Sequence, residues 1–211
     1  MEQHKYSISQ WCTVSDEVVS RLDKVVFEGE KGDFGVFAKA YYKANEIEYP
    51  KFFKMDALSK LAFIGSECLL QGEEFEQPNS DIALLFSNAS SSLDTDIKHS
   101  ETIVDKDSYY PSPAVFVYTL ANICLAEVSI RHKLQSENAF FISPSFDVDL
   151  MYTQATYLLA SDRAKKVICA WVNYLEGEYR FFGYIVSSYQ EELLDHTKEN
   201  IKNLYKGKWK I

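Results

Sequence analysis

The sequence lacks the patterns that mark membrane and secreted proteins. No apolar run approaches the ~18 residues that a membrane span needs, and residues 1–12 contain no apolar core of the signal-peptide kind. The four cysteines are widely spaced and form no C-x-x-C pair, so they indicate buried free thiols rather than a zinc site or a disulfide framework. We therefore expect a cytoplasmic protein without a membrane span.

Positive charge is also scarce. The chain has 22 Lys and Arg against 31 Asp and Glu, for a net charge of -9. Nucleic-acid binding depends on cations that neutralise phosphates, so this balance argues against a nucleic-acid partner. The one basic cluster, residues 205–211, is more typical of a solvated chain end.

Histidines and glycine motifs are too few to support common catalytic or cofactor sites. The four histidines (His4, His99, His132 and His196) lie in no recognisable catalytic motif. Neither G-x-G-x-x-G nor a P-loop is present. The acidic pairs in residues 94–96 and 147–149 do not extend into a calcium loop. We expect no metal and no cofactor.

Apolar and aromatic residues, in contrast, are plentiful. The hydrophobic fraction is 46% and the aromatic fraction 15%, enough for a sizeable core. Such aromatic content is typical either of an aromatic-rich core or of a protein that contacts a partner.

Strand and helix signals alternate along the chain and end in a hairpin. Strand-like segments are expected at residues 5–14, 81–92, 138–143, 165–177 and 178–188, the last two joined by a Glu-Gly turn. Helical segments are expected at residues 14–23, 52–73 (capped by Asp56), 114–134, 147–164 (opened by Asp147 or Asp149) and 190–207. Residues 28–37 and 90–108 are expected to be loops. The segment 114–134 is apolar nearly all round, which predicts a long helix buried between layers. Together the pattern predicts an α/β fold with a mixed sheet and helices on both faces.

Ser145 stands in the turn between the expected strand 138–143 and the helix that follows. Many enzymes place a nucleophile in such a turn, but a serine needs a nearby base, and the glycines of a G-x-S-x-G motif are absent. A serine after a proline is more often a turn or cap residue. Both interpretations of Ser145 stay open at this point.

Several segments resemble the N-terminal half of the β-ketoacyl-acyl-carrier-protein synthases, which have a thiolase-like fold. The resemblance covers about residues 51–186 and is most specific in the expected long helix. Upstream, KMDALSKLAFIGSECLL and DIALLFSNASSS are similar to an early helix and the strand after it. Downstream, KKVICAWVNYLEG is similar to a strand that ends in glycines in the family, here replaced by Val172 and Asn173. The positions that match the family's pattern run from the helix entry to the turn before the next strand. They are Ser112-Pro113, Thr119-Leu120-Ala121-Asn122, Ala126-Glu127, Ile130-Arg131 and Ser136-Glu137.

The resemblance implies that Ser145 occupies the position of the family's active-site cysteine, with Pro144 where a small residue is usual. A serine hydroxyl is a much poorer nucleophile than a thiol with a pKa near ~8.5. The family's catalytic histidines belong to a second half for which this sequence has no counterpart. The resemblance therefore implies one ketosynthase N-terminal-like domain over residues 1–211, with a polar tail at 187–211 and no catalytic residue of its own.

A half scaffold is expected to cover its apolar surface with another chain. The resemblance implies pairing through the strand AFFIS, residues 139–143, either with a second copy or with a true ketosynthase. The chain would then act like a chain-length factor in fatty-acid or polyketide (aryl-polyene-type) biosynthesis, with an acyl carrier protein as a further partner.

The residues near Ser145, and the chain as a whole, allow further interpretations. The side chains of Phe140, Phe141, Phe146 and Met151 are candidates for an acyl-tunnel lining, or are ordinary core. An alternative function is a serine acyltransferase or hydrolase that pairs Ser145 with His132 or His196. A third possibility is a degenerate protein that only binds a partner.

Overall fold

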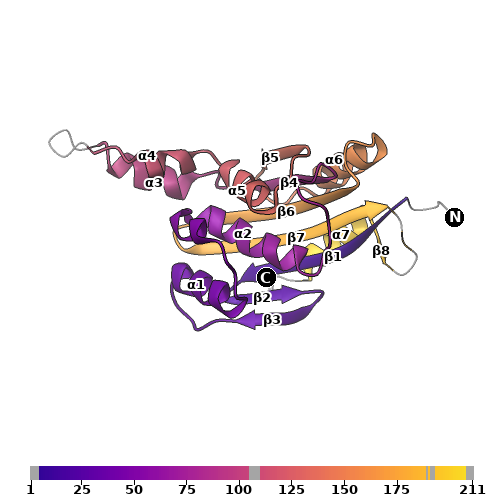
Figure 1. Cartoon of the computed structure of the whole chain (residues 1–211), viewed down its shortest axis with the longest axis horizontal. Helices are drawn as coiled ribbons and strands as arrows, with labels where there is room; N and C mark the ends of the chain where they lie inside the picture. The colour runs from indigo at the N-terminus through magenta and orange to yellow at the C-terminus, as the bar shows by residue number, and fades with distance from the viewer. Residues whose placement is uncertain (1–4, 105–109, 189, 191–192, 208–211) are drawn as a thin grey trace.

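The computed structural model describes residues 5–104, 110–188, 190 and 193–207 of the chain. Over these residues an eight-stranded sheet has the order β3-β2-β1-β7-β6-β4-β5, and β8 pairs with β1 (Figure 1). The strands are β1 Tyr6–Ser15, β2 Val18–Arg21, β3 Lys24–Glu28, β4 Ile82–Asn88, β5 Asn138–Ile142, β6 Lys166–Leu175, β7 Glu178–Ser188 and β8 Leu194–Asp195. The helices are α1 Phe34–Ala44, η1 Pro50–Lys54, α2 Ala57–Leu70, α3 Leu93–Glu101, α4 Pro113–Phe116, η2 Val117–Thr119, α5 Ile123–His132, α6 Val148–Ala160 and α7 Lys198–Lys206.

The sheet is mixed because its connections differ in length. Short turns join β1 to β2, β2 to β3 and β6 to β7, so these strands pair antiparallel. Longer helical connections lead from β4 to β5 and from β5 to β6, and β4 pairs parallel with both of these strands. The predicted mixed sheet is confirmed.

Helices cover both faces of the sheet and create two cores. Side chains of α1, α2 and α5 pack on one face, and those of α6 and α7 pack on the other. In Figure 1, α1, α2 and α5 lie in front of the sheet. The α/β fold class with helices on both faces is therefore confirmed.

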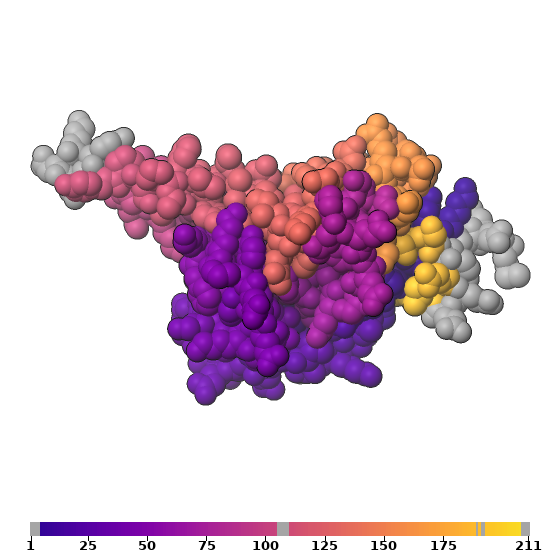
Figure 2. All heavy atoms as spheres, viewed as in Figure 1, coloured from indigo at the N-terminus to yellow at the C-terminus, as the bar shows by residue number. Residues whose placement is uncertain are grey.

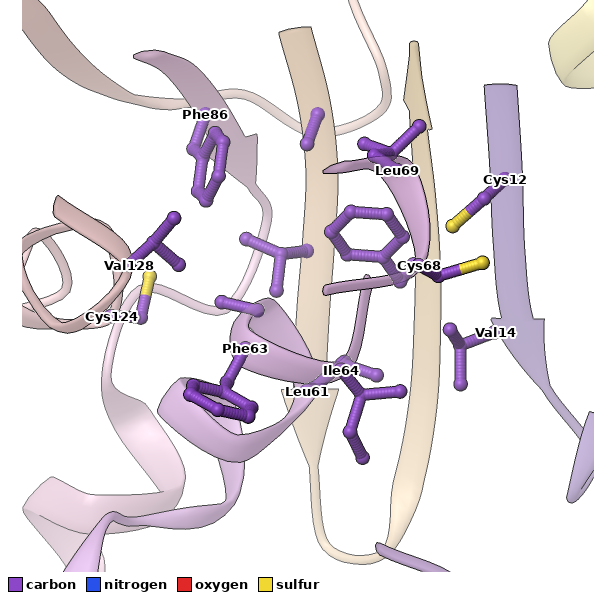
Figure 3. Close-up of a cluster of buried hydrophobic side chains, with 14 of the residues drawn as sticks. Cys12, Val14, Leu61, Phe63, Ile64, Cys68, Leu69, Phe86, Cys124 and Val128 are labelled. Atoms are coloured by element: carbon purple, nitrogen blue, oxygen red, sulfur yellow. The ribbon is translucent and has the colours of Figure 1, made fainter. Parts of the chain in front are cut away.

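The helix α2 forms where the sequence predicts a helix capped by Asp56, and it lies at the centre of the first core. Asp56 caps it, because its Oδ1 accepts a hydrogen bond from the Ser59 amide at 2.9 Å. Leu61, Ile64 and Leu69 are fully buried (Figure 3). α6 is capped in the same way by Asp147, which accepts from the Leu150 amide at 2.9 Å.

The expected helix at residues 14–23 is wrong. This segment contains the end of β1, the whole of β2 and two tight turns. Asp16 and Glu17 have φ values of 50° and 58°, and Leu22 and Asp23 have 49° and 65°. Two consecutive residues with positive φ match the twist of a hairpin, so the chain reverses twice instead of coiling.

Helices also occur in the two segments expected to be loops. α1 begins inside residues 28–37 because Asp33 caps it, accepting from the Gly35 amide at 2.7 Å. α3 lies inside residues 90–108, of which 105–108 fall outside the described residues. Its charges suit a helix dipole: Asp94 and Asp96 stand in the first turn, and Lys98 and His99 in the last.

The expected long helix at residues 114–134 is broken. Its two parts, 113–119 and 123–132, meet at an angle of 100°. A hydrogen bond spans the bend: Tyr118 Oη donates to the Glu127 carboxylate at 3.0 Å, whereas nine residues of straight helix would separate the two by about 13 Å along the axis. The segment is also not buried throughout, since Phe116 and Leu120 are 60% and 59% exposed.

β5 forms where a strand was predicted and lies at the edge of the sheet, and none of its residues is buried. The expected tail helix at 190–207 begins later, at Lys198, because β8 first pairs with β1. Residues 208–211 of the basic cluster lie outside the described part of the chain.

Candidate functional site

Ser145 lies where the parallel part of the sheet ends. β4, β5 and β6 run parallel, so their carboxyl ends meet at one edge. In open α/β sheets this edge is where ligands bind. Ser145 stands in the turn after β5, two residues before the cap of α6, and its side chain is exposed.

Two amide side chains hold the neighbouring turn after β4. Asn88 is fully buried, and its side chain exchanges two hydrogen bonds of 2.9 Å with the backbone of Ser91. Asn173 in β6 accepts from the amides of Ala89 and Ser90 at 3.1 and 3.0 Å. The backbone beside Ser145 is therefore fixed by the sheet rather than left as a free loop.

Two open hollows meet at Ser145. The larger, which we call the Ser145 groove, has a volume of about 1010 Å³ and lies between residues 142–149 and α7. An ion pair of 2.5 Å between Lys198 and Asp149 joins its two walls. The second hollow, of about 650 Å³, shares Pro144, Ser145 and Tyr205 with the first. Both hollows are open to solvent and carry charges of both signs.

Neither histidine of the serine-enzyme alternative lines these hollows. His132 belongs to α5, on the other face of the sheet, and its Nε2 lies 3.0 Å from Glu67 Oε1. His196 is buried against the rings of Tyr152 and Tyr184. Burial lowers the pKa of His196 to about 4. Among the described residues, neither His132 nor His196 therefore lies beside the Ser145 turn.

The four candidates for a tunnel lining are divided between the two cores. Phe140 packs against the first core. Phe141, Phe146 and Met151 pack in the second. Successive residues of a strand point to opposite faces, which separates Phe140 from Phe141. Phe146 alone of the four also lines the Ser145 groove.

Metal ligands do not gather in the described part of the chain, where no group of three or more His, Cys, Asp or Glu residues is placed to hold an ion. Within the same residues no single helix is long and apolar enough to cross a membrane. The bent pair 113–119 and 123–132 reaches that length and composition only when its parts are counted together.

A second feature is the exposed apolar side of the molecule, which we call the β5 side. It comprises the β5 edge together with α4, η2 and α5, and the segment of α3 and α4 projects from the body as an arm (Figure 2). Its exposed apolar side chains are Phe116 (60%), Val117 (49%), Leu120 (59%), Ile130 (56%) and Ile142 (55%).

Sequence reasoning missed most of this surface because it assigned residues 114–134 to a buried helix. One signal was available: Glu127 is the only acidic residue in that segment. In the structure Glu127 is 3% exposed and pairs with Lys51 at 2.7 Å as well as with Tyr118. A buried charge requires partners, and the contact with Tyr118 joins the two parts of the bent segment.

No protein-family model and no curated protein matches the sequence, but solved structures match the fold. A structure described as the ishigamide ketosynthase/chain length factor gives a TM-score of 0.67 at 14% identity, covering 89% of this chain and 63% of that one. A ketosynthase (ApeO) in complex with its chain length factor (ApeC) from Xenorhabdus doucetiae gives 0.60 at 12% identity, covering 97% and 92%.

A third match is a type II PKS acyl-carrier protein in complex with its ketosynthase (AntDE:AntF), with a TM-score of 0.58 at 10% identity over 88% and 63% of the two chains. The chain thus spans less than two thirds of the first and third of these structures, but most of the second. The mixed sheet and its flanking helices match the fold of thiolase-like ketosynthases and chain length factors.

Proposed function

We propose that this chain is a non-catalytic, ketosynthase-like subunit that acts beside a partner ketosynthase, in the manner of a chain length factor. The pathway class would be fatty-acid or polyketide (aryl-polyene-type) biosynthesis. The observation that carries the proposal is the combination of a ketosynthase-like fold with an exposed serine, and no described histidine beside it, at the turn after β5. The chemical reason is that an isolated hydroxyl does not ionise near neutral pH and cannot take an acyl group from a thioester at a useful rate.

The β5 side supports a partner of this kind. An edge strand leaves backbone donors and acceptors unpaired, and a second strand can bind there. The exposed apolar side chains of the arm add apolar surface, and its burial against a partner would be favourable. Two of the structurally similar proteins are themselves described as ketosynthases with chain length factors.

The test is co-purification with a candidate ketosynthase, chosen from the genes beside that of this chain, using matched edge variants. Ile142→Asp places a charge on the β5 edge, where the side chain is 55% exposed. Val25→Asp places the same charge on β3, the opposite edge of the sheet, where the side chain is 61% exposed. We expect the ketosynthase to co-purify with the wild type and with Val25→Asp, but not with Ile142→Asp.

Labelling with a fluorophosphonate provides the complementary test of the serine. We expect no adduct on Ser145 and no acyl-thioester turnover by the isolated chain. An adduct that disappears in Ser145→Ala, together with turnover by the chain alone, would contradict a non-catalytic role and favour the serine acyltransferase.

A further inference from the structure

The fold brings together two cysteines that are 56 positions apart in the sequence. Cys12 belongs to β1 and Cys68 to α2, and both side chains are 1% exposed. Figure 3 shows their sulfur atoms turned toward each other in the gap between the strand and the helix. Cys12 Sγ donates to the carbonyl oxygen of Gly65 at 3.5 Å, three residues before Cys68 in α2.

A cation stands beside this pair. Arg21 in β2 is only partly buried, and its Nη2 donates to the carbonyl oxygen of Gln71 at 2.6 Å while its Nε donates to Gln10 Oε1 at 3.1 Å. Its charge favours the thiolate form of both cysteines. Since Gln71 follows directly on the last turn of α2, the guanidinium joins β2 to the end of the helix that carries Cys68.

The two thiols differ in acidity in a way that suits nucleophilic attack by one of them. The neighbouring Cys12 thiol, opposed by burial and helped by the Arg21 charge, lowers the pKa of the Cys68 thiol. Burial raises the pKa of the Cys12 thiol. Burial likewise raises the pKa of the other two cysteines, Cys124 and Cys169, the latter to about 12. Cys68 is therefore distinct among four equally buried thiols.

We propose that Cys12 and Cys68 form a redox pair that a peroxide oxidises to a disulfide joining β1 to α2. The Cys68 thiolate attacks one peroxide oxygen, the O–O bond breaks, and hydroxide leaves, which produces a sulfenic acid. The Cys12 sulfur then attacks the Cys68 sulfur, the S–S bond forms and the S–O bond breaks. Two thiols and one hydrogen peroxide thus yield one disulfide and two water molecules.

The bond would tie the sheet to the helix that packs at the centre of its first core. It would close a loop that includes β2, β3 and α1. The bond would therefore lower the conformational entropy of the unfolded chain more than that of the folded chain. We expect the oxidised protein to unfold at a higher temperature than the reduced protein. This inference does not depend on the proposed partner role.

The experiment treats the folded chain of 211 residues with dilute hydrogen peroxide, blocks remaining thiols with N-ethylmaleimide in denaturant, and maps the peptides by mass spectrometry. We expect the wild type to lose two of its four free thiols and to show one cross-linked peptide pair, Cys12 with Cys68. Reduction with dithiothreitol should restore all four thiols.

Cys124→Ala is the matched control, because Cys124 is also 1% exposed but lies in α5, where burial and no other described cysteine raises the pKa of its thiol. It should keep the cross-link and the rise in unfolding temperature, whereas Cys12→Ala and Cys68→Ala should lose both. The proposal would be overturned if the wild type still carried four N-ethylmaleimide-labelled cysteines after oxidation. A cross-link to another cysteine, or equal loss of all four thiols, would also overturn it. The wild-type peptide map decides the matter even where a variant fails to fold.

Discussion

At the residue scale, three carboxylates near α2 and α5 are held by specific donors: Glu127 is buried, and Asp56 and Glu67 are half-buried. Asp56 accepts from Thr95 Oγ1 at 2.8 Å as well as from its cap partner, and Glu127 is held as described above. Burial acts to raise the pKa of Glu67, but hydrogen bonds from His132 and Arg131 outweigh it and leave that pKa below its ordinary value. For Asp56 burial prevails over the hydrogen bonds and raises the pKa.

Asp56 thus gives a pH-dependent prediction. Because its pKa is higher in the folded than in the unfolded chain, the stability linked to its proton is complete below about 3.8 and is lost as pH rises through the raised value. Asp56→Asn does not titrate and still caps a helix. We expect its unfolding free energy, measured with urea, to rise relative to the wild type between pH 3.5 and 7.

Asp56→Ala is the control for the cap itself: it does not titrate either, so its pH profile should parallel that of Asp56→Asn and lie below it by about 1 kcal/mol for the lost cap. Parallel pH profiles for the wild type and Asp56→Asn would contradict the assigned effect of burial.

Gly65 gives a prediction about packing. A Cβ at this position in α2 would overlap the ring of Phe181 in β7, so Gly65→Ala should destabilise the protein by about 1–3 kcal/mol despite its better helix propensity. Gly32→Ala is the matched control, because its Cβ would meet nothing within 4 Å, and it should stay within about 0.5 kcal/mol of the wild type. Equal urea midpoints for the two variants would rule out the close packing of α2 on β7.

At the element scale, the break between η2 and α5 determines which apolar surface the molecule exposes. Ser92 Oγ donates to the carbonyl oxygen of Thr119 at 2.7 Å, so the start of α3 fixes the last residue of η2. The bond from Tyr118 to Glu127 then folds η2 back on α5. The arm is held by these polar contacts at its base.

Tyr118→Phe removes one donor from a buried carboxylate and should cost about 1.5–3 kcal/mol in urea unfolding. We also expect faster cleavage of residues 113–122 by a protease at low concentration. Tyr110→Phe is the control, since Tyr110 lies in the same region of the chain but is 79% exposed. Unchanged stability and unchanged cleavage in Tyr118→Phe would show that another contact holds the arm.

Local signals predicted several elements, although the Asp33 cap of α1 and the charges of α3 were overlooked, and elements set by distant contacts could not be predicted. α2 and α6 carry capping aspartates and helical spacing, and the turn of the β6–β7 hairpin contains Gly177 with a φ of 89°. The turns around β2 use non-glycine residues at positive φ, which gave no signal. The bend before α5 depends on Tyr118, Ser92 and Glu127 meeting in three dimensions.

The same division holds for the sites. The position of Ser145 in a turn between strand and helix followed from local patterns. The contact between Cys12 and Cys68 depends on how α2 lies across β1, and no spacing rule relates cysteines so far apart. The exposed arm could not be predicted, because residues 114–134 were expected to form one unbroken helix.

At the scale of the whole molecule, the two edges of the sheet differ in their surroundings. β3 ends the sheet in an antiparallel hairpin, and Val25 and Val26 are exposed on it. β5 ends the sheet on the side where the apolar arm projects (Figure 1). An apolar partner would therefore gain more contact at β5 than at β3, which is why the proposed interface lies there.

Hydrogen–deuterium exchange of the chain with and without the candidate ketosynthase tests this account most directly. We predict slower exchange of the amides in Asn138–Ile142 and in residues 113–120 on complex formation, with no change in Lys24–Glu28. Protection of β3 instead of β5 would contradict the proposed role. Exchange that is the same with and without saturating ketosynthase at both edges would contradict it as well.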